Sequence, residues 1–395
     1  MSRAIAVVFA KEVLENLRDK RVVFSAFFFG VLLAPMIFAL TTTMASQRAV
    51  RTQEQPLKLP VVGAQFAPNL IRFLKENGVE VQEIQAKVDD AIREVRAGHR
   101  ELVLRIGQEY VDKLQAGEPA PLELVVDTSN GQAAGNTDRA RRLLDSYGHQ
   151  LAALRLLVRG VSPEVVQPVD VRLLDVATPA GRSLLLLGML TYFCFMSMLV
   201  GGFYLAIDTT AGERERGSLE PLLALPVRRS ELIIGKMLAT SAFMCASLLL
   251  TLPAFAIALR FIPLEALGMS ANFGFAVTAK MFLIMATFIP LGAGLMTVVA
   301  SFTRSNREAQ SWVSLVYIVP LAPIMFAVIN GTKATPALVA VPSLGQHLIA
   351  TDLMRGDPIP VLNAAICTGS SLLLGALLVW LAVRLYEREA ILGNV

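Results

Sequence analysis

Few residues in this 395-residue chain have the types and spacing that metal binding or nucleophilic catalysis requires. Each of the three cysteines lies inside a long apolar run, and the three histidines are far apart. A metal site needs such ligands at short spacings, and a disulfide scaffold needs more cysteines. No Ser/His/Asp set or paired carboxylate lies near the end of an apolar run, so we do not expect an enzyme. The residues concerned are Cys194, Cys245, Cys367, His99, His149 and His347.

The sequence also lacks a phosphate-binding loop. Such a loop reads Gly-x-x-x-x-Gly-Lys-Ser/Thr, and its backbone amides hold the phosphates of a nucleotide. Gly235-Lys236 is followed by Met237, and Ser230 stands where the first glycine is required. We therefore expect no cofactor in this chain. Any energy source must lie in another chain or in an ion gradient.

The most specific pattern is a charged segment, residues 208–236, which contains a predicted short helix. Gly217 permits a turn, Ser218 is a good N-cap, and Glu220 lies in the first turn, where the helix dipole favours an anion. Pro226 ends this helix after about two turns. The side chains that the helix would present are Leu219, Leu222 and Leu223.

Two interpretations of this segment remain open on physical grounds. A short helix joined by brief linkers to two spanning helices can transmit a movement of a soluble partner to the membrane helices. A charged loop that only fixes membrane topology would have the same composition.

The elements that must hold this segment are apolar. Hydrophobic residues make up 54% of the chain, charged residues 17%, and the mean hydropathy is +0.56, whereas soluble domains are about 45–50% apolar and about 25% charged. A bilayer core of about 30 Å needs roughly 20 apolar residues as a helix. Six stretches qualify: 22–44, 184–207, 237–259, 276–300, 312–329 and 361–385.

The Lys/Arg bias of the short loops predicts the orientation. Basic residues gather before the first stretch, in 208–236, after the fourth stretch and in the tail 386–395, which places both termini in the cytoplasm. Residues 1–21 carry an amphipathic pattern, with Ile5, Phe9, Val13 and Leu17 on one stripe. This pattern predicts an interfacial helix with basic residues near anionic headgroups, and a charged leader that sets topology is the alternative.

The segment 45–183 then lies outside. Short β-rich runs alternate there with amphipathic helices, and a long helix is predicted over about 132–158. This alternation is typical of a small α/β domain. The fold class that we predict is an α-helical polytopic membrane protein, with six transmembrane helices and an extracytoplasmic α/β domain inserted between the first and second.

The charged segment resembles the loop of ABC-2-type exporter permeases, which has the pattern Glu-x-Glu-x-Gly-Ser/Thr-x-Glu-x-Leu-Leu-x-x-Pro. Residues 301–310, Ser-Phe-Thr-Arg-Ser-Asn-Arg-Glu-Ala-Gln, are similar to a second cytoplasmic loop of that family. The large domain after the first span and the four later spans resemble the sodium-efflux branch. The residues matching the first pattern are Glu213, Glu215, Gly217, Ser218, Glu220, Leu222, Leu223 and Pro226.

The resemblance implies a half-transporter in the plasma membrane of a bacterial cell. Two permease subunits, identical or related, would pair, and separate ATPase subunits would bind ATP and Mg²⁺. Residues 1–21 would be a connecting helix and 208–236 would hold the coupling helix. The exported substrate would be sodium or a small toxic or hydrophobic compound, and no nucleic acid is involved. The residues expected to couple to the ATPase are Glu213, Glu215, Gly217, Ser218, Leu219, Glu220, Leu222, Leu223, Pro226, Arg304 and Arg307.

Two other functions stay open beside ATP-driven export. One is a mechanotransmitter, in which work done by the ATPase reaches the outer domain and nothing crosses the membrane. The other is a secondary carrier that runs without ATP, although a shortage of charged residues inside the spans disfavours a proton relay. The sequence leaves open the substrate, the choice between homodimer and heterodimer, and the role of the outer domain.

Overall fold

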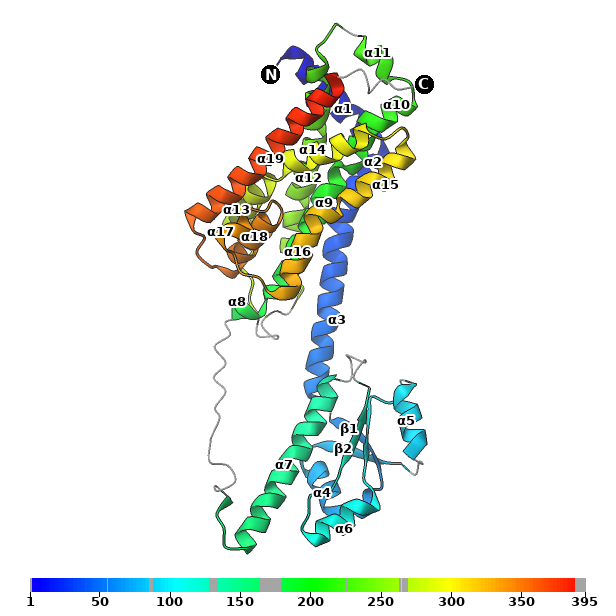
Figure 1. Cartoon of the computed structure of the whole chain (residues 1–395), viewed down its shortest axis with the longest axis vertical. Helices are drawn as coiled ribbons and strands as arrows, with labels where there is room; N and C mark the ends of the chain where they lie inside the picture. Colours follow the sequence, from blue (N-terminus) through cyan, green and yellow to red (C-terminus); the bar gives the residue numbers. More distant parts are fainter. Residues whose placement is uncertain are drawn as a thin grey trace. The chain divides into compact units, whose positions relative to one another are not determined.

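A computed structural model describes residues 2–54, 56–84, 88–97, 99–127, 134–163, 179–224, 226–262, 264 and 269–387. The contacts divide the chain into two units. Unit 1 comprises Met1–Met44 and Val176–Val395, and unit 2 comprises Ala45–Asp175 (Figure 1).

Unit 2 contains a four-stranded sheet in the order β2-β1-β3-β4. β1 pairs in parallel with β2 and β3, with Leu57 opposite Val79, and β4 runs antiparallel to β3. Parallel neighbours need crossover connections, and helices supply them here. The strands are β1 (Leu57–Val62), β2 (Val79–Glu83), β3 (Leu102–Arg105) and β4 (Glu123–Val126).

Two layers of side chains cover this sheet. Alternate residues of β1, such as Leu59 and Val61, join a buried core with Leu70, Leu74 and Tyr110 from the helices. Val62 on the opposite face packs with Val95 and Val103 in a smaller cluster. The helices are α4 (Pro68–Glu76), α5 (Val88–Arg96), α6 (Gln108–Ala116) and α7 (Ala134–Val158), with a 3-10 turn at Ala64–Phe66.

The predicted α/β alternation of this segment is confirmed, with element ends shifted by a few residues. Helix α6 was not predicted, and neither was the length of α3 (Ala34–Glu54), which runs beyond the predicted span end at residue 44. After Met44 the sequence continues with good helix formers, so the backbone hydrogen-bond ladder persists past the apolar part. The placement of unit 2 outside the membrane remains a prediction.

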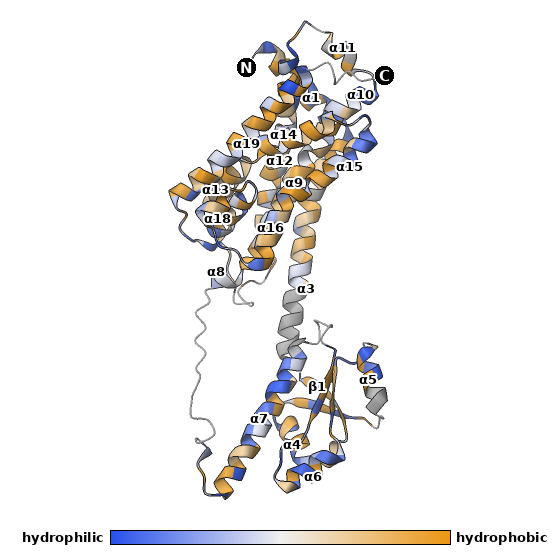
Figure 2. Ribbon diagram, viewed as in Figure 1, coloured by the Kyte–Doolittle hydropathy of each residue, from blue (hydrophilic) through white to orange (hydrophobic). Residues whose placement is uncertain are grey.

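Within the described residues, unit 1 holds six helical segments long and apolar enough to cross a membrane, in agreement with the predicted number (Figure 2). The second ends at Glu215 rather than at the predicted Ile207, and the fifth begins at Asn306 rather than near Trp312. The segments are Ala26–Met44, Leu184–Glu215, Arg229–Leu259, Phe275–Ser301, Asn306–Asn330 and Val361–Glu387.

Several of these segments change helical geometry along their length. The first passes through a π-helical stretch, η1, and the second through another, η4. The fourth breaks at Thr287–Phe288, ahead of Pro290, and the fifth at Tyr317, ahead of Pro320. Proline removes a backbone donor and crowds the preceding turn, which accounts for breaks at these places.

The helices of unit 1 pack around α9 and α12, and α1 lies against α12. Phe195, Met198, Phe255 and Phe288 are among the buried side chains at the centre. The helices are α1 (Arg3–Arg18), α2 (Lys20–Val23), η1 (Phe24–Leu33), α3, α8 (Pro179–Arg182), α9 (Leu184–Ile207), η4 (Asp208–Gly212), α10 (Glu213–Glu215), α11 (Leu219–Leu223), α12 (Arg229–Leu259), α13 (Phe275–Ala286), α14 (Ile289–Ser301), α15 (Asn306–Val316), α16 (Ile318–Asn330), α17 (Pro336–Val339), α18 (Leu344–Arg355) and α19 (Val361–Glu387).

A buried amide ties α18 to the breaks in its neighbours. The Gln346 side chain donates to Thr287 Oγ1 (3.1 Å) and to Ser371 Oγ (2.6 Å), and it accepts from the Ser343 amide (2.8 Å). Ser343 Oγ in turn donates to the Pro320 carbonyl oxygen (2.7 Å). The first turn of α18 therefore contacts α13, α16 and α19 through satisfied polar groups.

Candidate functional site

The charged segment continues the second spanning helix as a single rod. α9 passes without interruption into η4 and then into α10, which ends at Glu215. The rod stops at Gly217, whose φ of 68° lies in the left-handed region that side chains other than glycine rarely adopt. α11 follows, and the chain turns into α12. The predicted short helix is therefore present as α11, separated from the rod by the turn at Gly217.

A buried ion pair fixes the end of this rod to α12. Lys236 Nζ donates to a carboxylate oxygen of Glu213 and to the Thr209 carbonyl oxygen (2.8 Å). The side chains of Lys236 and Glu213 are 1% and 7% exposed. Charges buried this deeply persist in proteins when they are paired and hydrogen-bonded. The pair therefore locks the η4–α10 segment against the start of the third span.

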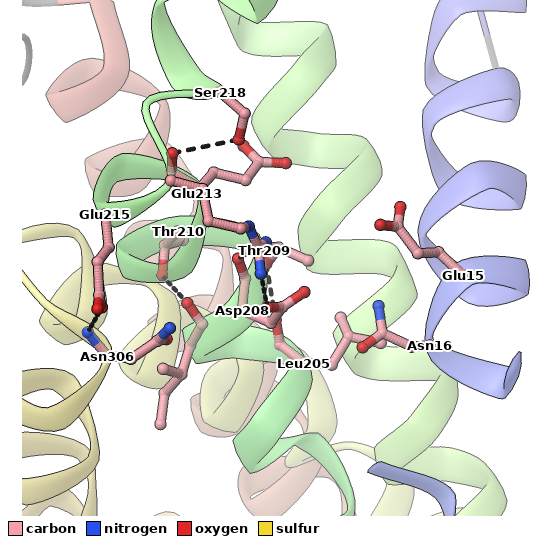
Figure 3. A network of polar contacts seen from close by, with 12 residues as sticks. Glu15, Asn16, Leu205, Asp208, Thr209, Thr210, Glu213, Glu215, Ser218 and Asn306 are labelled. Atoms are coloured by element: carbon pink, nitrogen blue, oxygen red, sulfur yellow. Dashed lines mark hydrogen bonds and ion pairs between the residues drawn. The ribbon is translucent and has the colours of Figure 1, made fainter. Parts of the chain in front are cut away.

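The next two residues of α10 bind the ends of two other helices. Arg214 donates to the carbonyl oxygens of Ser301 (3.0 Å) and Thr303 (2.8 Å), at the C-terminus of α14. Glu215 accepts from the Asn306 amide (2.6 Å), at the N-terminus of α15 (Figure 3). Cations favour helix C-termini and anions favour helix N-termini, so each charge matches the dipole that it meets. α10 is thus clamped to the 302–305 loop, which the sequence singled out separately.

Helix α1 approaches the same cluster from the other side. Lys11 Nζ lies 3.0 Å from a carboxylate oxygen of Glu12 and 3.9 Å from one of Glu213. Glu12 is 2% exposed, and the Asn16 amide donates to its carbonyl oxygen (2.9 Å). Burial raises the pKa of the Glu12 carboxyl, and Lys11 offsets part of that rise. The cluster therefore joins α1, α10 and α12.

The raised pKa of Glu12 has a measurable consequence for stability. The folded protein holds the Glu12 proton more tightly than the unfolded chain does. The Glu12 carboxyl therefore destabilises the fold increasingly as the pH rises from the ordinary pKa of about 4.5 to the raised pKa of the folded state. Glu12→Gln removes this contribution. We expect the melting temperature of the variant in detergent to gain on that of the wild type between pH 4 and pH 8. If the melting temperatures of Glu12→Gln and of the wild type changed with pH in parallel, the result would contradict the burial of a titrating carboxyl at this position.

The structure separates the predicted coupling residues into anchored and exposed groups. Leu219 is buried against Ile233, Met237, Val298 and Tyr386, so it anchors α11 to the bundle rather than facing outward. The Ser218 hydroxyl donates to the Glu213 carbonyl oxygen (3.2 Å) and closes the turn before α11 (Figure 3). Leu222 is half-buried. The exposed residues are Glu215, Gly217, Ser218, Pro226, Arg304 and Arg307, and the side chains of Glu220 and Leu223 lie outside the described parts of the chain.

Sequence reasoning missed several residues of this cluster. Glu12 and Asn16 stand four positions apart on α1, and Lys236 begins an otherwise apolar stretch of α12. Asp208 forms an ion pair with Arg216 (2.8 Å), and Arg216 lies about one turn after Glu213. The available signal was a lysine next to a long apolar run and polar residues on the buried side of an amphipathic helix.

Six apolar helical segments, joined at one end by a cluster of buried charges, are typical of a multi-pass membrane protein. The sequence matches the family described as "ABC-2 family transporter protein" over residues 6–385, and the chain belongs to this family. It is also 25% identical over 365 residues to the ABC transporter permease protein NatB of Bacillus subtilis (strain 168), which covers 91% of this chain and 92% of that protein. The chain is thus a membrane permease of the ABC transporter class, and its family implies an ABC ATPase as partner.

Proposed function

We propose that this protein is the permease subunit of an ATP-driven exporter, and that residues 208–236 together with the 302–305 loop receive the motion of a separate ATPase. In this proposal both termini and this loop face the cytoplasm, unit 2 lies outside, and two permease subunits pair in a bacterial plasma membrane. ATP and Mg²⁺ bind to the ATPase.

One observation carries the proposal. The α9–η4–α10 rod runs from the centre of the bundle to the loop without a break, and Glu213–Lys236 ties it to α12. A force applied to α11 through Leu219 therefore reaches two spans as a displacement rather than as bending of a loose loop. A charged segment that only fixed membrane topology would not need its side chains to bind α12 and the ends of α14 and α15.

The substrate that we propose is sodium or a small toxic or hydrophobic compound. Sodium is supported by the resemblance to the sodium-efflux branch, and a hydrophobic compound by the apolar interior of unit 1. Growth of a deletion strain across sodium, lithium and potassium salts and a panel of hydrophobic drugs would narrow the choice. Sensitivity confined to one group identifies the class, and unchanged growth on all of them contradicts this part of the proposal.

The coupling role is tested with the ATPase that copurifies with the full-length permease. We expect Leu222→Asp and Glu220→Ala to reduce ATPase binding or permease-stimulated hydrolysis at least tenfold, while the melting temperature of the bundle stays unchanged. Lys333→Ala, an exposed charge after α16, is the matched control. Normal binding and hydrolysis in both loop variants would refute the assignment of this loop.

Flux into sealed vesicles separates export from the two alternatives. An exporter moves substrate only when both ATPase and ATP are present. Transport without the ATPase would establish a secondary carrier, and ATP hydrolysis with no flux of any candidate substrate would favour mechanotransmission.

A further inference from the structure

Unit 2 has a cavity beside the face of its sheet that carries α5. The cavity measures about 530 Å³, which lies within the range of small-molecule binding sites. Its lining comes from β1, β2, β3, α5, α7 and the segment that joins α5 to β3. None of the lining residues belongs to the charged cluster of α1, α10 and α12. The cavity is therefore a feature of unit 2 alone.

The alternation of side chains along β1 decides which of them reach this cavity. Leu59 and Val61 point into the main core, so Lys58 and Pro60 point to the opposite face and line the cavity. Gln82 of β2 is the register partner of Pro60 and lines the cavity as well. Helix α5 packs mainly against β3 and β4. The part of this face over β1 and β2 is therefore left open as the floor of the cavity.

The charges that line the cavity are only partly compensated. Arg100 forms an ion pair with Glu94 of α5. The Glu101 carboxylate accepts a hydrogen bond from the Asn136 amide (2.7 Å), but a neutral amide leaves the negative charge in place. Within the described residues, the exposed Lys58 side chain has no ion-pair partner. The described lining therefore presents a cation and an anion that lack a countercharge.

Apolar surface completes the lining. Pro56, Pro60 and Leu102 contribute carbon surface, and the last two are buried. Within the described chain, no three His, Cys, Asp or Glu side chains stand close enough together to hold a metal ion. A simple anion would leave Glu101 without a countercharge, and a simple cation would leave Lys58 without one. The lining therefore matches a molecule that has an ammonium group, an anionic group and a short hydrocarbon part.

We propose that this cavity of unit 2 binds a small zwitterion of the amino acid or dipeptide class. Lys58 binds the carboxylate of the ligand, Glu101 binds its ammonium group, and the proline rings and Leu102 contact its hydrocarbon part. Hydrogen bonds between charged groups are strong, so two contacts of opposite sign give a small ligand both affinity and orientation. The proposal concerns a ligand of unit 2, and it is independent of ATPase coupling and of the side of the membrane on which unit 2 lies.

Titration calorimetry of the full-length protein in nanodiscs tests the site with three probes. Leucylglycine carries both charges, N-acetyl-leucylglycine lacks the ammonium group, and leucylglycinamide lacks the carboxylate. We expect leucylglycine to bind, and each of the other two to bind roughly tenfold more weakly or worse, because a charge-assisted hydrogen bond is lost.

Variants of the two charged residues assign each contact. Lys58→Ala should weaken the binding of leucylglycine about tenfold and leave leucylglycinamide as weak as before, because the contact that it removes is the one to the carboxylate. Glu101→Gln should have the corresponding effect on the ammonium group. Lys75→Ala is the matched control, since Lys75 is exposed on α4, which packs on the opposite face of the sheet, and this variant should bind like the wild type.

Hydrogen exchange supplies a second measurement, which locates the ligand without any substitution. Leucylglycine should slow exchange in peptides covering residues 56–62 and 99–105 and leave a peptide from α4 unchanged. Absence of leucylglycine binding, or equal binding of the three probes, would overturn the proposal. Binding that both variants leave unchanged would overturn it as well, since the ligand would then lie elsewhere. None of these results bears on whether the ATPase binds at the loop.

Discussion

Replacing Lys236 by methionine is expected to destabilise the protein by roughly 3–5 kcal/mol, the usual cost of leaving one member of a buried ion pair without its partner. The Glu213 side chain, 7% exposed, would remain beside Glu12, and the cation left near it would be Lys11, which is 52% exposed and 3.9 Å away. The carboxylate would have to take up a proton or pull α10 away from α12. Thermal unfolding of the purified protein in detergent measures this loss.

The double variant Glu213→Leu/Lys236→Met separates the ion pair from simple packing. Because buried pairs can be replaced by apolar residues at little cost, we expect the double variant to recover most of the lost stability. Lys333→Met provides the matched control, since Lys333 is exposed and lies outside this cluster, and it should change stability by less than about 1 kcal/mol. If the double variant is as unstable as the sum of the two single variants, the pair does not exist as described.

Replacing Gly345 by alanine is expected to disrupt the contact between α17 and α18. An added Cβ would lie 2.2 Å from the Val339 carbonyl oxygen and 3.0 Å from the Cys367 sulfur, and backbone cannot yield as a flexible side chain does. We expect a loss of about 2–3 kcal/mol or a failure to fold, at the upper end of the cost of overpacking. Displacement of α18 would also break the Gln346 contacts with Thr287 and Ser371.

Gly369→Ala is the control for this variant. An added Cβ at Gly369 meets nothing within 4 Å, although the residue also lies in a helix of unit 1. Alanine should leave the melting temperature unchanged or raise it, because it favours helix more than glycine does. A stable Gly345→Ala protein with unaltered accessibility of Cys367 to thiol reagents would contradict the close approach at Gly345.

Local patterns in the sequence predicted much of what the structure shows. An apolar run of about 20 residues forms a helix in a membrane wherever it occurs, so the six spans were recognisable without their neighbours. The strands and most helices of unit 2 were also predictable from local patterns, because glycines follow its first helices and its strands are short and apolar. Helix α6 was missed because Gln108–Ala116 is short and buries one residue, Tyr110.

The predicted coupling residues show where such reasoning ends. The spacing of Gly217, Ser218 and Pro226 predicted a short helix, and a helix stands there as α11. The role of Leu219 was predicted as outward, yet the residue is buried, because the end of α19 and the start of α12 approach it from distant parts of the chain. Exposure to a partner depends on what else covers a side chain, and a local pattern does not contain that information.

The sequence by itself determined that this chain spans a membrane and carries a small α/β domain, since both follow from composition or short-range periodicity. Tertiary structure decided which charges meet. Lys236 could have faced solvent like other lysines near a span end, and α1 could have turned its apolar stripe toward lipid. Packing of α1 and α10 on α12 buries Lys236, Glu213 and Glu12 together, and a buried charge must then find a partner.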